Sequence, residues 1–360
     1  MSTTPQRFFV GRGRLVDGQP RPWRTEVLDE ATCAQHIEQG RLDDPADYEA
    51  DPGLVDAMNV ALLLGRPLLL TGRPGTGKSQ FADRVAWEFG LAPVLRFESQ
   101  SVSEARDLFY RFDMIGRMAA ARPGQAGGAA DAQRFVTLAA LGKAVLYSKP
   151  LPAGGLAGLS LKPPHPAPTG GRASVVLIDE IDKASRDFPN DLLNAMDSLS
   201  FDMAELEGSH FEAAREPQTR PLVIITSNSE RELPEPFLRR CVYYNIPDPT
   251  PATLARIVHA RVLRRQGLAA PETLPPLYRD LVDCFVDYRN KAGRNIVFAP
   301  GTSELIDLAR VVAADPEVRA DEPLKHDANV ASARRAAGAV AKGKGDAAEF
   351  DKHLGSWTRK

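Results

Sequence analysis

Runs of apolar residues that end in a polar residue recur between residues 67 and 228 of the chain. They read PLLLT at 67–71, VLRFE at 94–98, VVLIDEID at 175–182 and PLVIITSN at 221–228. Short, nearly continuous apolar runs are typical of strands that are buried on both faces of a parallel sheet. Between the first two runs Phe81, Val85 and Phe89 recur at four-residue spacing, which predicts a helix. The alternation predicts an α/β fold, a parallel sheet flanked by helices.

The pattern changes to helical spacing from Thr250 onward. A threonine followed by a proline makes a good helix start, and Thr250 and Pro251 supply it. The later residues repeat at three- and four-residue spacing on three faces: Leu254, Ile257, Val258 and Val262; Leu277, Leu281, Phe285 and Tyr288; Leu305, Leu308, Ala309 and Val312. We therefore expect a small all-α lid after the α/β core. The acids Asp346, Glu349 and Asp351 in the tail predict a last lid helix with solvated charges.

These patterns divide the chain into three parts. We expect an N-terminal extension at 1–50, an α/β core at 51–249 and a helical lid with a tail at 250–360. The core contains a Pro- and Gly-rich stretch at 148–174, which can be neither helix nor central strand. It is either a loop that faces a partner or the pore of a ring, or a surface loop. A small, polar stretch at 121–133 predicts an exposed loop tip.

The aromatic residues Phe109, Tyr110 and Phe112 allow two interpretations. Aromatic loops grip threaded chains in related motors, which would place them in a pore. Phe109 and Phe112 are three residues apart, which is helix-face spacing, and this favours packing in the core.

Composition and charge exclude several classes of protein. The chain has 360 residues, 43% hydrophobic and 26% charged, with a formal net charge of −2. This balance is ordinary for a globular protein and gives no overall attraction to nucleic acid or an anionic membrane. Cys33, Cys241 and Cys284 lie too far apart for a zinc motif or a disulfide framework, so we expect buried thiols. No apolar run is long enough to cross a bilayer, and we expect a cytoplasmic protein.

The turn between the first strand and its helix carries the first chemical signal. Residues 72–79 read GRPGTGKS and match the pattern G-x-x-x-x-G-K-[ST]. Glycines allow a backbone that points several N–H groups at phosphate oxygens, and the helix that follows adds its positive dipole end. Lys78 can reach the β- and γ-phosphates, and Ser79 can place its hydroxyl on Mg²⁺. The predicted nucleotide-binding residues in this turn are Gly72, Arg73, Pro74, Gly75, Thr76, Gly77, Lys78 and Ser79.

Two carboxylates follow the apolar strand at 175–178. The carboxyl ends of parallel strands face the ligand crevice of an α/β sheet. Asp179 is predicted to bind Mg²⁺ through the water shell of the ion, with Ser79 as the other metal-binding residue, and Glu180 is the predicted base that orients and polarises the attacking water. The alternative is an acidic helix cap after a core strand.

Asn228 ends the next apolar strand. If that strand neighbours the one that ends at Asp179, its amide can hold the attacking water or a γ-phosphate oxygen. The alternative is an ordinary turn asparagine.

A short helix around 236–239 ends in Arg239 and Arg240 and precedes another strand. Arginine stabilises transition-state charge on a transferring phosphoryl group, sometimes from a neighbouring subunit. One or both of these residues is a candidate for that role. The alternative is a pair of surface arginines at a helix C-terminus.

These four parts, in this order, resemble an AAA+ ATPase over residues 50–250. Within that class the chain resembles the MoxR-like ATPases, in DPGLVDAMNVALLLGRPLLLTGRPGTGKS (51–79), EARDLFYRFDMIGRM (104–118) and LIDEIDKASRDFPNDLLNAMD (177–197). The resemblance implies ATP as the nucleotide and a ring, a homo-hexamer, with arginines supplied in trans. It also implies chaperone-like remodelling of a protein partner, often one with a von Willebrand factor A domain. Variants of this kind often occur in bacterial conflict or defence systems.

The chain departs from the MoxR-like pattern in three places. It has Asp182 and Lys183 where common members have Asn-Arg, and Asn228 and Ser229 where they have Asn-Pro. The start of a lid helix, where members carry a sensor arginine, reads FAPGTSELIDLAR at 298–310. The resemblance therefore identifies a divergent branch.

Three functions follow from these patterns. The first is ATP hydrolysis that drives conformational work on a protein partner. The second is a nucleotide-gated scaffold that turns over slowly, which the missing lid arginine favours. The third is a restriction-type nucleic-acid translocase, which the near-neutral charge and the lack of an appended nucleic-acid motif disfavour.

Overall fold

The computed structural model describes residues 44–91, 93–120, 132–150, 170–206, 209–229, 231–264, 274–291, 296, 298–343 and 345–359. The chain divides into two compact units. The first contains residues 50–71 and 78–245, and the second contains 42–49, 72–77 and 246–360. Among the described residues no helix is both long enough and apolar enough to cross a membrane.

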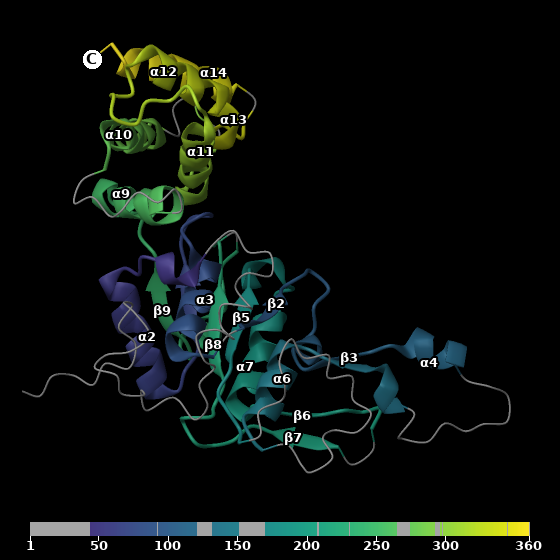
Figure 1. Cartoon of the computed structure of the whole chain (residues 1–360). Helices are drawn as coiled ribbons and strands as arrows, with labels where there is room; N and C mark the ends of the chain where they lie inside the picture. Colours follow the sequence, from purple (N-terminus) through teal and green to yellow (C-terminus); the bar gives the residue numbers. More distant parts are fainter. Residues whose placement is uncertain are drawn as a thin grey trace, which may run out of the picture. The chain divides into compact units, whose positions relative to one another are not determined.

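A five-stranded parallel sheet forms the centre of the first unit (Figure 1). The strand order is β2-β5-β8-β1-β9, so strands distant in sequence lie side by side. The strands are β1 (Leu68–Thr71), β2 (Leu95–Glu98), β5 (Val175–Asp179), β8 (Leu222–Thr226) and β9 (Val242–Asn245). The apolar runs of the sequence correctly predict β1, β2, β5 and β8. Strands β1, β5 and β8 are buried in the sheet, whereas β2 lies at its edge and alternates between buried and more exposed residues. The predicted neighbourhood of β5 and β8 is also confirmed.

Helices flank this sheet, as the alternation of patterns predicts. They are α2 (Pro52–Leu64), α3 (Lys78–Phe89), α6 (Ala140–Tyr147), α7 (Phe188–Ser198) and α8 (Glu235–Leu238). The predicted face of α3 is confirmed, since Phe81, Val85 and Phe89 are all fully buried. Asp51 caps α2 by accepting the backbone N–H of Gly53 at 2.9 Å.

Smaller elements complete the first unit. Two short antiparallel pairs are β3 (Tyr110–Phe112) with β4 (Val136–Leu138), and β6 (Ser200–Asp202) with β7 (His210–Glu212). The exposed helix α4 (Met114–Ala120) follows β3. Single turns of 3₁₀ helix lie at Ala105–Leu108, Gln133–Phe135 and Ile181–Lys183.

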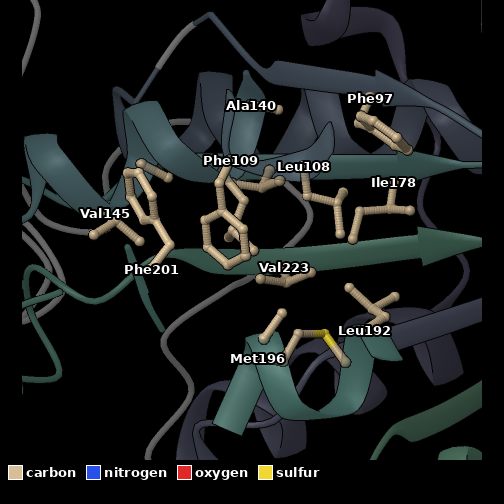
Figure 2. Packing of buried hydrophobic residues seen from close by; sticks show 14 of the residues in the cluster. Phe97, Leu108, Phe109, Ala140, Val145, Ile178, Leu192, Met196, Phe201 and Val223 are labelled. Carbon is tan, nitrogen blue, oxygen red and sulfur yellow. The ribbon is translucent and has the colours of Figure 1, made fainter. Parts of the chain in front are cut away.

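The main core of the first unit lies between one face of the sheet and the helices α6 and α7 (Figure 2). Alternate residues of each strand reach it, such as Val176 and Ile178 of β5 and Val223 and Ile225 of β8. This spacing of two is the pleat of a strand, although the other face of the same strands is buried too. Phe109 stacks on Phe201 with ring centroids 4.8 Å apart.

The expected helix through Phe109 and Phe112 is wrong, although the expected core packing of Phe109 is confirmed. Residues 110–112 form strand β3, and Tyr110 pairs across to Leu138 of β4. Phe109 and Tyr110 are buried and Phe112 is partly buried against the same core. Pairing with residues 24 to 28 positions further along the chain decides this conformation, and spacing of three cannot show it.

The second unit is helical from Pro251 onward, which confirms the all-α lid. Its elements are the 3₁₀ turn Pro45–Asp47, α9 (Pro251–Val258), a π-helical turn at His259–Leu263, α10 (Pro276–Asn290), α11 (Thr302–Ala314), α12 (Asp327–Arg335), α13 (Ala337–Val340) and α14 (Asp346–Trp357). Thr250 caps α9 by accepting the Thr253 N–H at 3.2 Å. The apolar faces predicted for α9, α10 and α11 meet in one core.

The tail forms the predicted last helix, α14, but its charges are not all solvated. Asp346 is buried, because its carboxylate accepts the Gly343 N–H at 2.8 Å and closes the turn before the helix. The thiols of Cys241 and Cys284 are buried and free, as expected, and burial raises the pKa of each to about 12. Cys33, residues 1–43, the loop tip at 121–131 and the centre of the Pro- and Gly-rich stretch at 151–169 lie outside the described residues.

A glycine fixes how closely α6 approaches the chain before β3. A Cβ atom on Gly142 would lie 2.0 Å from the carbonyl oxygen of Phe109. We expect Gly142→Ala to lower the free energy of unfolding by about 1–3 kcal/mol, because backbone must move to admit the methyl group. Urea denaturation followed by circular dichroism measures this effect.

Gly338→Ala is the matched control for this substitution. Gly338 lies on α13, and a Cβ atom there meets nothing within 4 Å. Helix propensity then makes the change neutral or stabilising, by up to about 1 kcal/mol. An equal effect of both substitutions would contradict the close contact at Gly142.

Candidate functional site

The loop at residues 72–77, called the phosphate-type loop below, has the backbone conformation that its glycines predict. Gly72, Gly75 and Gly77 have φ angles of 138°, 78° and 86°, a region that side chains disfavour. Thr76 turns back on the loop, where its hydroxyl donates to the carbonyl oxygen of Arg73 at 2.9 Å. The loop follows β1 directly, and α3 begins at Lys78. This strand–loop–helix order is the context that the GRPGTGKS pattern requires.

Lys78 is buried beside three acids in the first unit. Burial lowers the pKa of its ammonium group, while the nearby charges of Asp179, Asp182 and Glu180 act in the opposite direction. The ammonium group of Lys78 thus lies near carboxylates that belong to a different element of the fold.

Asp179 lies at the carboxyl end of β5 and receives two hydroxyl groups. Its Oδ1 atom accepts from the hydroxyl of Ser79 at 2.8 Å and from the hydroxyl of Thr226. The structure thus brings together Ser79 and Asp179, the two predicted Mg²⁺ ligands. A hydroxyl and a carboxylate oxygen fit Mg²⁺, which takes one or two protein ligands and completes its shell with water and phosphate. No group of three or more His, Cys, Asp or Glu that could hold a metal ion occurs in the described part of the chain.

Glu180 has an unusual backbone and an occupied carboxylate. Its φ and ψ angles are 54° and 51°, in the left-handed region, and its N–H donates to the Thr226 hydroxyl at 2.9 Å. Asn228 donates from its side-chain amide to Oε1 of Glu180 at 3.1 Å. Lys183 forms an ion pair with the other oxygen, Oε2. The structure therefore places Asn228 against Glu180, at the same edge of the sheet as Asp179.

Two residues of this cluster were missed by sequence reasoning as site residues. Thr226 is buried and binds both Asp179 and the backbone of Glu180, so it joins the ends of β5 and β8. Asp182 is buried and accepts the backbone N–H of Asn228 at 3.1 Å. The available signal was their position, since Thr226 ends its strand and Asp182 stands where the MoxR-like pattern has asparagine.

The two candidate arginines do not join this cluster. Arg239 and Arg240 lie at the end of α8, and both are exposed. Arg239 pairs with Glu235, and Arg240 pairs with Asp197 at 3.5 Å. Neither contacts Asp179 or Glu180 within this chain.

The first turn of α11 lies against the phosphate-type loop within the second unit. A Cβ atom on Gly301 would lie 2.8 Å from the carbonyl oxygen of Pro74, and one on Gly75 would lie 3.5 Å from the hydroxyl of Ser303. The N–H of Gly301 is bound by Glu304 at 2.8 Å. No arginine stands at this helix start, and Arg310, further along α11, forms an ion pair with Asp307 at 3.8 Å.

Comparison with solved structures finds matches at low TM-scores and low sequence identity. Two mutants of RuvB from Thermotoga maritima align at a TM-score of 0.40 with 14% identity and 0.39 with 13% identity. Each alignment covers 72% of this chain, and 60% and 59% of the RuvB chains respectively. The AAA domain of FIGL-1 in complex with ADP aligns at a TM-score of 0.40 with 17% identity, over 93% of this chain and 98% of that domain.

Comparison of the sequence itself is more specific. No curated protein matches the chain. Residues 67–241, just under half of the chain, match the family described as AAA domain (dynein-related subfamily). This range begins just before β1 and ends just before β9, and it contains Lys78, Asp179 and Asn228. Residues 67–241 are therefore similar to an AAA domain of the dynein-related subfamily.

Proposed function

We propose that this chain is an Mg²⁺-dependent ATPase that uses the nucleotide to remodel or activate a protein partner. The observation that supports hydrolysis most is the cluster at the carboxyl edge of the sheet. There Ser79 and Thr226 both donate hydrogen bonds to Asp179. The next residue, Glu180, accepts a hydrogen bond from the side-chain amide of Asn228. The cluster thus contains two oxygen atoms that can bind a metal ion, from Ser79 and Asp179. It also contains a separate carboxylate, that of Glu180, that can orient water. Phosphoryl transfer to water needs both functions.

The residues of the chain take distinct parts in this reaction. Residues 72–77 hold the phosphates with backbone N–H groups, and Lys78 places its charge at the β- and γ-phosphates. Glu180 accepts a proton from water as the water oxygen bonds to the γ-phosphorus, and the bond from that phosphorus to the bridging oxygen breaks. Asn228 orients Glu180 or the water. Ser79 and Asp179 would hold Mg²⁺, which neutralises charge on the phosphate oxygens when bound.

The finer identity of the protein rests on resemblance. We propose a MoxR-like ATPase of a divergent branch, working as a homo-hexameric ring in the cytoplasm. Arg239 and Arg240 are exposed at the end of α8, so either is accessible to a neighbouring subunit's nucleotide. A partner with a von Willebrand factor A domain and a place in a bacterial defence system are parts of the same proposal.

A nucleotide-gated scaffold with slow turnover is a second candidate. The observation that favours it is the state of Glu180, whose two carboxylate oxygens are engaged by Lys183 and by Asn228. A water that approaches Glu180 would have to displace one of these two partners. A steady hydrolysis rate that rises when partner is added would exclude the scaffold.

The proposed function predicts opposite effects of two substitutions. Lys78→Ala should abolish ATP binding, because the loop loses the cation that reaches the phosphates. Glu180→Gln should keep ATP binding and lower hydrolysis by about 10²-fold or more, because the metal site remains while the base is lost. Binding of a fluorescent ATP analogue and release of phosphate measure the two effects. Tight binding by Lys78→Ala, or a normal rate in Glu180→Gln, would contradict the roles proposed here.

The two hydrogen bonds of the Thr226 hydroxyl predict different hydrolysis rates for two matched variants. Thr226→Val keeps the shape of the buried side chain but removes both hydrogen bonds, so we expect hydrolysis to fall about tenfold or more. Thr226→Ser retains the hydroxyl and should stay close to the wild-type rate. Steady-state rates at saturating ATP test this, and equal rates of the two variants would remove Thr226 from the site.

Mixed assemblies test the arginines. Arg239→Ala or Arg240→Ala subunits should be inactive alone if the residue completes a neighbour's site. Mixing them with Lys78→Ala subunits should restore part of the activity, because an intact loop then meets an intact arginine across an interface. Activity that does not recover at any mixing ratio would exclude a role in trans.

A further inference from the structure

A cavity lies at the opposite end of β8 from Thr226. It has a volume of about 330 Å³ and lies in the first unit, where β1 and β8 begin. Met58 and Leu62 of α2, Met196 and Leu199 at the end of α7, and Leu222 of β8 line it. Figure 2 shows Met196 beside Val223, which also lines the cavity. The volume is at the small end of the range of ligand sites, and the lining is apolar, as such sites require.

Arginines surround this cavity, and no acid does. Arg66, Arg215 and Arg220 are among the lining residues, which include no aspartate or glutamate. Arg215 pairs with Glu212 at 3.2 Å. Among the described residues, the guanidinium group of Arg66 has one long hydrogen bond, 3.4 Å, to the carbonyl oxygen of Arg239. The guanidinium group of Arg220 has no hydrogen bond or ion pair with any of the described residues, although its backbone N–H donates to the carbonyl oxygen of Glu216 at 3.1 Å. Two guanidinium groups are thus available to an anion.

The apolar surface continues outside the cavity along α2. Val60, Leu63 and Leu64 are 43%, 60% and 57% exposed. Their spacing of three and four residues puts them on one face of the helix, and Leu63 and Leu64 also line the cavity. An exposed apolar cluster with a charged rim is a common mark of an interaction surface.

We propose that this cavity is a docking site for an acidic segment of a partner protein. The segment inserts one large apolar side chain among Met58, Leu62 and Leu222, and sets carboxylates against Arg66 and Arg220. A buried anchor of this kind carries most of the energy of an interface, and arginine binds carboxylates with two parallel hydrogen bonds. A protein fits better than a small amphipathic acid, because Val60 and Leu63 extend the apolar surface beyond the volume that a small molecule fills.

The docking site gives a place to the partner of the proposed function, and it rests on that function only for the existence of a partner. Binding involves neither Lys78 nor Glu180, so it can be measured without nucleotide. A Lys78→Ala protein should bind the segment with wild-type affinity. Failure of hydrolysis and failure of docking are therefore separate results.

Selection from a random library tests the chemistry of the segment. Phage that display random 12-residue peptides are selected on the immobilised full chain, with counter-selection on the Leu64→Lys, Arg220→Glu double variant. We expect enriched peptides to carry a large apolar residue with aspartate or glutamate beside it. Enriched peptides without acids, or no enrichment over the double variant, would overturn the proposal.

Single variants then test the two parts of the site. A synthetic fluorescent peptide of the enriched sequence is titrated with protein, and its anisotropy is measured at low and high NaCl. Arg220→Glu and Leu64→Lys should each weaken binding at least about tenfold, because one removes a charge partner and the other an apolar contact. Both residues lie at the surface, so the fold should survive. Arg319→Glu, an exposed arginine of the second unit, is the matched control and should leave the affinity unchanged.

Two further measurements test other occupants. Saturable binding of dodecanoate to the cavity, with no enriched peptide, would show that the site takes a small amphipathic acid and overturn the proposal. Sedimentation velocity compares the oligomeric state of wild type and Leu64→Lys. An assembly that Leu64→Lys dissociates would show that a second copy of the chain covers this face, and would overturn the proposal as well.

Discussion

The chemistry proposed for this chain depends on one hydroxyl group that joins two strands. Thr226, at the end of β8, donates to the carboxylate of Asp179 and accepts from the backbone N–H of Glu180, 2.9 Å away. Asp179 is the last residue of β5, the neighbouring strand, and Glu180 follows it, so these bonds hold the acidic end of one strand to the polar end of the next. They also support the left-handed backbone of Glu180, a conformation that costs an ordinary residue free energy. Ser79, Lys78 and Asn228 then assemble around a carboxylate pair whose position is already fixed.

Much of the fold could be predicted from the sequence, because the signals there are local. Strands β1, β5 and β8 are nearly continuous apolar runs, and such runs need no partner to be recognised. Thr250 and Pro251 predict the start of α9, because the cap needs only a hydrogen bond between Thr250 and Thr253, three residues apart. The positions of Lys78, Ser79 and Asp179 follow from a loop and a strand that each occupy fewer than ten residues.

The remaining features depend on residues far apart in the sequence. Strand β3 exists because residues 110–112 pair with 136–138, and spacing of three residues suggested a helix instead. Asp346 is buried because the Gly343 N–H satisfies its carboxylate, whereas composition suggested a solvated acid. The ion pair of Lys183 with Glu180 requires the 3₁₀ turn at Ile181–Lys183, and no pattern of apolar residues predicts this turn. The cavity with its arginine rim comes from α2, α7 and the start of β8, and only folding brings these segments together.

Strand β8 extends from the cavity to the carboxylate cluster within the first unit. From Leu222 at the cavity to Thr226 at the carboxylates it rises about 13 Å, at roughly 3.3 Å per residue. It pairs with β5 on one side and β1 on the other, and all five side chains are buried. The strand that supplies a hydroxyl to the acids therefore begins at the arginine-rimmed cavity, so the two sites share one continuous backbone element.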